Sequence, residues 1–479
     1  MGTVYIPEIR NPEVSGRDFN PIYVWLISLV AALGGLLFGY DWVVIGGAKP
    51  FYEVFFHLTR ASQQGWAMSC ALLGCLFGAL SAGVLSDRLG RKLSLIISAV
   101  GFSVSSLATG LANTLDMFVF WRILGGASIG LASALSPMYI SEIAPAGIRG
   151  RLVSLNQITI VLGMLSAQVA NWLIARPMPF DLTAQEMLAS WNGQIGWRWM
   201  FGVTAIPALV FLAAAFAIPE SPRWLVKNGA RIKAHDILAR IAGHNRADHE
   251  VREIEISLGA EPGRDNWKLL VESKMFKPLS LAVGLAVLQQ WCGVNVIFNY
   301  AQEVFMEAGY NLSSILLNIV ITGAVLVVFT LVALATVDKL GRRFLMLAGL
   351  AGLSTVYILL GALYRVHYHG IAMMALILAA ISFYAMSLAP VTWVIIAEVF
   401  PNRIRGNAIS IAVASLWIAC FILTYTFPLL NRQLGAAGTF WIYAGICLAG
   451  FSFTFVALPE TKGKSLEEIE TSWIRQPTD

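Results

Sequence analysis

Two residues of opposite charge lie inside stretches of the sequence that are otherwise apolar. Asp41 lies in the run of residues 22–46, and Arg122 lies in the run of residues 117–140. An unpaired charge in the middle of a membrane costs about 2.5–3.5 kcal/mol on insertion scales, so such residues are usually paired and functional. A guanidinium favours the ionised form of a neighbouring carboxyl group, whereas burial favours the neutral form. We therefore predict that Asp41 binds and releases a proton as its contact with Arg122 changes; the alternative is a static ion pair.

The composition predicts that membrane-spanning helices position these residues. Of the 479 residues, 57% are hydrophobic and 13% are charged, and the mean hydropathy is +0.69. Soluble proteins carry roughly 25% charged residues, so soluble enzymes, disordered proteins and nucleic-acid-binding proteins are excluded. A helical span needs about 20 mostly apolar residues. Twelve runs have this character: 22–46, 64–86, 93–112, 117–140, 152–175, 198–218, 279–301, 312–337, 344–365, 371–397, 408–430 and 438–458. We predict an all-α polytopic membrane protein with twelve transmembrane helices.

The two charged residues are expected at matching depths. The first run crosses outward and the fourth crosses inward, and Asp41 and Arg122 each lie about five residues from the outer end of their run. At ~1.5 Å per residue, both are about 8 Å deep. Arg122 is expected to be the only basic residue in the interior of a span.

An internal repeat divides the spans into two sets of six. Three motifs recur in the same order, after the second, fourth and sixth span of each half: 87–91 as 338–342, 142–150 as 398–406, and 219–221 as 459–461. Two parallel repeats around a central site form a transporter architecture. The predicted units are an N-terminal six-helix half (1–218), a central loop with short helices (219–277), a C-terminal six-helix half (278–458) and a tail (459–479).

The basic residues predict the orientation of the chain. Lys and Arg are concentrated in the loops after the even-numbered spans and in residues 219–277. Cytoplasmic loops carry an excess of these residues. We therefore expect both termini and the central loop to be cytoplasmic.

Several motifs together resemble the sugar porter family of the major facilitator superfamily, over nearly the whole chain. They are GGLLFGYD at 34–41, GVLSDRLGRK at 83–92, PMYISEIAP at 137–145, PESPRWL at 219–225, QQWCGVNVIFNY at 289–300, PVTWVIIAEVFPNRIRG at 390–406 and PETKGKSLEEIE at 459–470. The chain is most similar in appearance to bacterial proton–pentose symporters, above all the xylose type. The resemblance implies that the two halves alternate access around one sugar. It also implies proton coupling, because an Asp at the position of Asp41 marks the proton symporters of the family.

The resemblance places sugar contacts on several spans. Amides suit sugars because each offers donors and an acceptor to neighbouring hydroxyl groups. The amides at the family's positions are Gln157, Gln289, Gln290 and Asn295, and the aromatic residues that can stack on a sugar are Phe38, Trp393 and Trp417. For a single amide the alternative is a helix–helix hydrogen bond. For a single aromatic residue the alternative is packing against lipid or the core.

Two residues predict breaks in the helices at this site. On an unbroken helix, Gln289, Gln290 and Asn295 would point in three directions around the axis. Gly293 permits a local break, which is expected at transporter binding sites. Pro390, inside the tenth run, removes a helix hydrogen bond and predicts a hinge.

The chain departs from the family at three positions of the C-terminal half. Asn299 stands where most relatives have a tyrosine, and it shares a helix face with Asn295. Leu326 and Leu416 stand where relatives have polar residues. An apolar wall does not select for a hydroxyl group as a hydrogen-bonding site does. The substrate therefore stays open among a pentose such as xylose, a related hexose, a deoxy sugar and a cyclitol.

Charged residues at the inner ends of the spans are predicted to form a gate. In the family, such residues make ion-pair networks that hold the outward-open state, and breaking them shifts a two-state equilibrium. The predicted gating residues are Asp87, Arg91, Glu142, Arg149, Asp338, Arg342, Glu398 and Arg405, with Arg151 and Glu220 beside them. The alternative, orientation by positive charge alone, explains the arginines but not the repeated Glu142 and Glu398.

We therefore predict a proton-coupled monosaccharide symporter of the cytoplasmic (inner) membrane, and no enzyme. A facilitative uniporter for a sugar or cyclitol is the first alternative, and a non-transporting sugar sensor is the second. The expected partners are the sugar, the proton and the lipid bilayer. No cofactor, metal or nucleic acid is expected, and the chain is expected to act as a monomer.

Overall fold

The computed structural model describes residues 19–179, 183–259, 273–310, 312–400, 405–460 and 462, and all of the regular structure in these ranges is helical. The side chains of a few residues inside these ranges, among them Asp338 and Arg405, lie outside the description. The helices are α1 (Pro21–Phe55), α2 (Ala61–Leu89), α3 (Arg91–Gly110), α4 (Leu115–Ile143), α5 (Arg149–Ile174), α6 (Ala184–Ala189), α7 (Trp197–Gly202), α8 (Ala205–Ala217), α9 (Pro222–Lys227), α10 (Arg231–Ala242), α11 (His244–Gly259), α13 (Ser273–Trp291), α14 (Val294–Asn299), α15 (Ala301–Glu307), α16 (Leu312–Leu340), α17 (Arg342–Arg365), α18 (Ile371–Met386), α19 (Leu388–Glu398) and α20 (Arg405–Ala457), with a 3₁₀ turn at Ala146–Ile148 and a π-helical turn at Asn192–Gly196.

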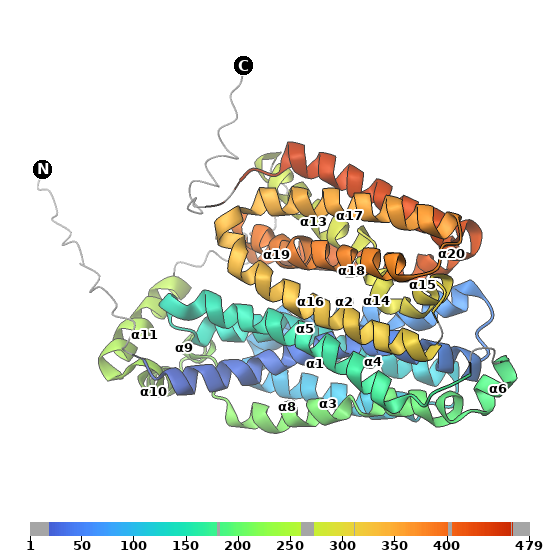
Figure 1. Cartoon of the computed structure of the whole chain (residues 1–479). Helices are drawn as coiled ribbons and strands as arrows, with labels where there is room; N and C mark the ends of the chain where they lie inside the picture. The colour runs from blue at the N-terminus through green and yellow to red at the C-terminus, as the bar shows by residue number, and fades with distance from the viewer. Residues whose placement is uncertain are drawn as a thin grey trace, which may run out of the picture.

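The long helices form the predicted set of membrane spans. Within the described ranges, eleven helical stretches are long and apolar enough to cross a membrane. One of them, α20, contains two helices joined at Gly435, where φ is 67°. Twelve crossings result, which confirms the predicted fold class. The long helices run along one common direction, with α9, α10 and α11 at one end of the bundle and α6 at the other (Figure 1). We call these the inner end and the outer end.

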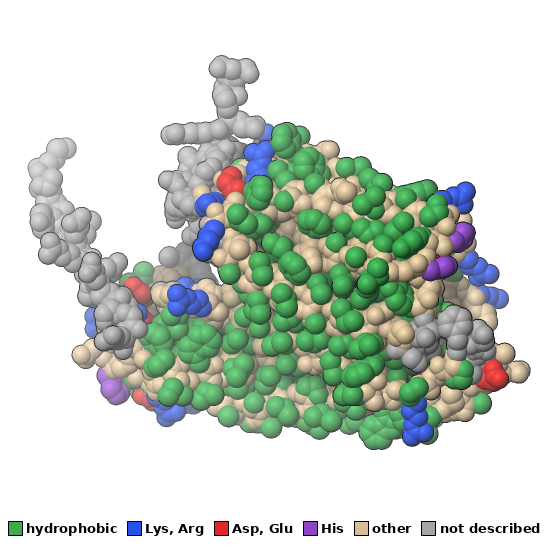
Figure 2. All heavy atoms as spheres, in the orientation of Figure 1, with side chains coloured by type: hydrophobic (Ala, Val, Ile, Leu, Met, Phe, Trp, Pro, Cys, Tyr) green, Lys and Arg blue, Asp and Glu red, His purple; other side chains and the backbone are tan. Residues whose placement is uncertain are grey.

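The middle of the bundle carries an apolar surface. Large hydrophobic side chains are exposed along several spans, among them Phe77 at 65%, Val210 at 55%, Val328 at 55% and Leu448 at 51%. On the face shown in Figure 2, hydrophobic side chains cover the middle, and Lys, Arg, Asp, Glu and His gather toward the two ends. Continuous apolar surface of this extent indicates contact with lipid. The protein is therefore a multi-pass membrane protein.

The sequence repeat is a repeat of structure at the inner end of each half. Gly90 and Gly341 precede α3 and α17, and both have φ of 90°, which favours glycine. The Glu220 carboxylate accepts hydrogen bonds from the first two backbone N–H groups of α3, at 2.8 and 3.1 Å. Glu460 does the same at α17, at 3.0 and 3.2 Å. A carboxylate suits the positive end of a helix. In each half, the glutamate that follows the sixth span thus caps the start of the third span.

Two predicted helix breaks are present. Gly293 has φ of 86° and separates α13 from α14. Ser387 separates α18 from α19, and Pro390 follows within the first turn of α19. Met386, the last residue of α18, is four residues before Pro390. Because proline has no N–H group, the Met386 carbonyl group lacks its helical hydrogen-bond donor. Both breaks lie in the C-terminal half, beside the predicted sugar-binding amides.

The first helix is longer than expected. The apolar run ends at residue 46, but α1 continues to Phe55 and includes Lys49, Pro50 and Glu53. Lys49 is therefore a second basic residue in the interior of a span, and the expectation that Arg122 is alone there was wrong. The run ended in the sequence because charges and a proline interrupt it. In the structure, the lysine is 2% exposed and paired, so the helix tolerates it.

The two halves contact each other closely in the outer part of the bundle. Three glycines allow this: Gly46 of α1 faces the Phe298 carbonyl group, Gly65 of α2 faces the Tyr425 carbonyl group, and Gly323 of α16 faces the Gln168 side chain. A Cβ atom at Gly46 or Gly65 would lie 2.4 Å from the opposing oxygen. The backbones therefore meet at distances that only glycine permits.

Candidate functional site

Asp41 and Arg122 form a buried ion pair, as predicted. The Arg122 guanidinium donates to the Asp41 carboxylate at 2.5 Å, and the two residues are 5% and 7% exposed. The guanidinium also lies over the ring of Phe201, 5.3 Å from its centre. Both residues belong to the N-terminal half, on α1 and α4. The pair is therefore carried within one half of the molecule.

The two residues lie at one level in the bundle, as predicted, because their side chains are in contact. Asp41 lies 14 residues before Phe55, the end of α1, which is about 21 Å along the axis. Arg122 lies seven residues after Leu115, the start of α4, which is about 10 Å. The two counts differ because α1 continues beyond the end of the apolar run at residue 46, so the outer ends of α1 and α4 do not lie at one level.

A small cavity adjoins the pair and reaches the other half. Its volume is about 20 Å³, which is room for one water-sized molecule. The N-terminal half contributes Asp41, Arg122, Phe38 and Trp42 to its lining, and the C-terminal half contributes Asn299. Asn299 is 4% exposed, and its Oδ1 atom is buried with no hydrogen-bond partner among the described atoms. A predicted substrate-binding residue thus shares a cavity with the charged pair.

The break at Gly293 brings three predicted amides together. The Asn295 amide donates to Gln290 Oε1 at 2.6 Å, and the Gln290 amide donates to Gln289 Oε1 at 3.4 Å. The Gln289 amide donates to the carbonyl groups of Leu388 and Ala389, at 3.0 and 3.1 Å. Those carbonyl groups belong to α19, directly after its break. The two broken spans therefore meet through a chain of amides that can exchange partners with hydroxyl groups.

The predicted aromatic residues separate into two places. Phe38 and Trp417 are in edge contact across the two halves, with ring centres 5.8 Å apart. Trp42 joins them, 5.6 Å from Phe38 and 6.0 Å from Trp417. Trp393 is 39% exposed on α19, and no ring contact with this cluster occurs among the described residues. Gln157 lies half-buried on α5. The structure therefore brings Phe38 and Trp417 together, and leaves Trp393 apart from them.

The leucines at the variant positions are buried. Leu326 of α16 is 3% exposed and Leu416 of α20 is 5% exposed. Leu326 belongs to the core cluster that contains α14, and Leu416 belongs to the cluster that contains Trp417. Neither residue offers a hydrogen bond from its side chain, so the walls they form are apolar.

The predicted gating residues form separate networks in the two halves. In the N-terminal half, the Arg91 guanidinium contacts Glu142 at 2.9 Å and Asp87 at 3.3 Å, and Ser221 donates to Glu142. In the C-terminal half, Arg342 contacts Glu398 at 3.2 Å. Arg149 and Arg151 are exposed. The side chains of Asp338 and Arg405 lie outside the description. The Arg91–Glu142 and Arg342–Glu398 pairs thus each join residues of one half.

A second buried charged cluster was missed from the sequence. Lys49 contacts Glu303 of α15 in the other half, and it contacts Glu53 one turn further along α1, at 3.0 Å. The spacing of four residues between Lys49 and Glu53 was a signal for pairing. The apolar run ends at residue 46, before both residues, so the sequence pattern predicts a loop there instead of a helix. Gln168 was also missed; it is 1% exposed at the contact between the halves, and neither amide atom has a partner in the described structure.

Comparisons with known proteins give the family. A sequence model described as sugar (and other) transporter matches residues 27–473. The chain is 39% identical to the D-xylose-proton symporter of Escherichia coli (strain K12), over 95% of this chain and 97% of that one. It is 37% identical to the arabinose-proton symporter of Bacillus subtilis (strain 168), over 96% and 97%.

Solved structures agree over the same length. The inward open conformation of the xylose transporter XylE from E. coli matches with a TM-score of 0.82 and 37% identity, over 94% of this chain and 100% of that one. The proton:xylose symporter XylE bound to 6-bromo-6-deoxy-D-glucose matches with a TM-score of 0.79 and 38% identity, over 95% and 100%. The chain therefore belongs to the sugar transporter family of the major facilitator superfamily.

Proposed function

We propose that this protein couples the uptake of a monosaccharide to the entry of protons, by alternating access of its two halves. The observation that carries the proposal is the buried Asp41–Arg122 pair, which adjoins a cavity that the C-terminal half also lines. A carboxyl group in this position can be ionised while the guanidinium holds it, and neutral when the contact loosens. Relatives named xylose-, arabinose- and galactose-proton symporters support the same function.

The proposed sugar site lies where the broken helices meet. Gln289, Gln290 and Asn295 supply donors and acceptors, and Phe38 and Trp417 supply apolar faces for the C–H side of a sugar. We assign Gln157 and Trp393 to the same site on the resemblance to the family. Asn299 lies between the proposed sugar site and the cavity beside Asp41. It can thereby link the two sites.

The structure is assigned to the state that is closed on the outside. The halves are in contact through Gly46, Gly65 and Lys49 in the outer part. At the inner end, the Arg91–Glu142 and Arg342–Glu398 pairs each lie within one half. Each inner network then exchanges partners with the other half when the inner side closes, which is the gating role proposed for these residues. The agreement with the inward open conformation of XylE supports this assignment.

The proposed setting is the cytoplasmic membrane of a bacterium, with both termini and residues 219–277 on the cytoplasmic side. The distribution of basic residues supports this orientation. One chain holds both halves of the transport path, so a monomer is sufficient for transport.

The test is transport by the purified protein in liposomes. With the outside acidic, we expect labelled xylose to accumulate above its external concentration, and a protonophore to abolish that accumulation. A panel of arabinose, galactose, glucose and a deoxy sugar as competitors then ranks the substrates. Uptake that stops at equal concentrations and is insensitive to the protonophore would show a uniporter and contradict the proposal. Sugar binding without any counterflow would contradict it in favour of a sensor.

A further inference from the structure

Lys49 is a buried cation at the contact between the two halves. It lies on α1, is 2% exposed, and follows Asp41 on the same helix by eight residues, about 12 Å. An ammonium group removed from water needs a carboxylate nearby, because its desolvation is otherwise uncompensated. The partners of Lys49 therefore determine which arrangements of the two halves are stable.

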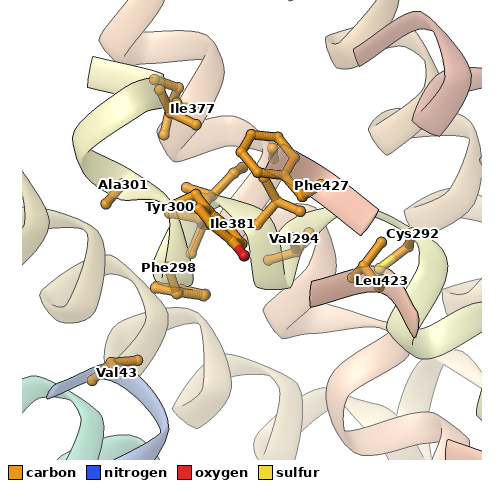
Figure 3. Close-up of a cluster of buried hydrophobic side chains, with 14 of the residues drawn as sticks. Val43, Cys292, Val294, Phe298, Tyr300, Ala301, Ile377, Ile381, Leu423 and Phe427 are labelled. Atoms are coloured by element: carbon orange, nitrogen blue, oxygen red, sulfur yellow. The ribbon is translucent and has the colours of Figure 1, made fainter. Parts of the chain in front are cut away.

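The C-terminal half supplies two partners to this lysine. The Glu303 carboxylate of α15 contacts the ammonium group directly. The ring of Tyr300 also faces it, with its centre 5.4 Å from Nζ. Tyr300 is held in place by a hydrogen bond to the Thr424 carbonyl group and by the ring of Phe427, 4.5 Å away (Figure 3). Both partners belong to the half that must move away from α1 when the outer side opens.

The N-terminal half supplies one partner that cannot move away. Glu53 lies one turn after Lys49 on α1 and contacts it at 3.0 Å. Glu53 is in turn held by Gln64 of α2, which is also in the N-terminal half, at 3.4 Å. The pair of Lys49 and Glu53 therefore survives any rigid rotation of one half against the other.

We infer that Lys49 is a positioning residue of the transport cycle. Its contact with Glu303 stabilises the closed outer side, and its contact with Glu53 keeps the ammonium group paired when that side opens. This inference rests on the proposed alternating access. Glu303 stabilises only the closed state, since its contact crosses the halves. Glu53 contributes most to the open state, where it is the only one of these two carboxylates left beside the ammonium group. The two carboxylates, on either side of one lysine, thus act on the equilibrium in opposite directions.

The test compares isosteric variants of the two carboxylates. Spin labels are attached to cysteines introduced at Thr59 and Leu434, which are exposed on the outer ends of the two halves. The five native cysteines are buried, so the label reacts mainly at the introduced positions. The distance distribution is measured in the full chain, at a pH where the unmodified protein shows both a short and a long distance. We expect Glu303→Gln to raise the ratio of long to short distances about tenfold, and Glu53→Gln to lower it.

The control variant changes a neighbouring carboxylate whose hydrogen bond stays within its own half. Glu307→Gln is the same change one turn beyond Glu303 on α15, where the carboxylate contacts Asn431 of its own half, and it should leave the ratio unchanged. Shifts of both test variants in one direction, or no shift in Glu303→Gln, would overturn the inference. Counterflow of xylose, measured on the same samples, reports separately on the proposed function: its absence from the unmodified protein would overturn transport, whatever the distances show.

Discussion

The helix α1 carries two buried charged clusters that differ in where their partners lie. Asp41 is paired with Arg122 of the same half, whereas Lys49 contacts Glu303 of the opposite half as well as Glu53 of its own helix. A pair within one half keeps its geometry while the halves rotate, so it changes mainly through the binding of a proton or through a local shift. A pair across the halves is made and broken in every cycle. The first arrangement suits coupling to protons, and the second suits control of the closed state.

The largest effect is expected where the halves approach most closely. Gly65→Val places side-chain atoms against the Tyr425 carbonyl group, which a Cβ atom would already approach to 2.4 Å. The outer side then cannot close, so net uptake and counterflow should both fall by more than about tenfold.

The matched control for this prediction is on the same helix. Gly83→Val places its Cβ where no other atom lies within 4 Å, and transport should be kept. Counterflow close to the unmodified rate in Gly65→Val would show that this contact is not required for the cycle. It would also weaken the distinction between contacts within a half and contacts across the halves.

A smaller effect is expected at Asn299, which reaches the cavity beside Asp41 from the opposite half. Asn299→Leu keeps the size of the side chain but removes its polar atoms from the cavity beside Asp41. We expect the proton-driven accumulation of sugar to fall at least about fivefold, with the affinity for sugar changed less. The measurements are accumulation under a pH gradient and the concentration of sugar that gives half-maximal counterflow.

Asn295→Leu is the comparison for Asn299. It removes the hydrogen bond from the Asn295 amide to Gln290 and should weaken sugar binding by about tenfold. The ratio of proton-driven accumulation to counterflow should stay unchanged. If the two leucine variants behave alike, Asn299 is a sugar contact only, and the proposed link to Asp41 fails.

The smallest effect is expected at the matched helix ends of the two halves. Glu220→Gln and Glu460→Gln each remove a charge that accepts hydrogen bonds from the start of a helix, and each should lower the free energy of unfolding by about 1 kcal/mol. The sites lie in different halves, so the losses should add in the double variant. Chemical unfolding in detergent measures this, and a coupling well above 0.5 kcal/mol would argue against two independent halves.

The sequence predicted the parts of this molecule that depend on local patterns. Hydrophobic runs predicted the spans, Gly293 and Pro390 predicted the breaks, and the repeated Glu220 and Glu460 motifs match in structure. Asp41 and Arg122 were identified as a pair because each is a rare charge in an apolar run, and their side chains are in contact. Charge scarcity is a strong signal because burial of an unpaired charge is costly.

The contacts between the halves could not be predicted in the same way. Charges and Pro50 end the apolar run and predict a loop at Lys49, and only the fold shows that Glu303 contacts this lysine from another span. The cavity shared by Asp41 and Asn299 likewise depends on how α14 is turned after its break. These features are set by the packing of distant segments, which no local pattern contains. The separation of Trp393 from the Phe38–Trp417 cluster has the same cause.

The most direct test of the central claim is the movement of protons that accompanies the sugar. Liposomes that contain the unmodified protein should show proton uptake when xylose, or the best sugar of the panel, is added outside. Asp41→Asn should show no such proton uptake and no accumulation of sugar against a gradient, but it should keep counterflow. The reason is that the amide is neutral, like the protonated carboxyl group, and cannot release a proton. Sugar-induced proton uptake by Asp41→Asn at the unmodified level would contradict the account.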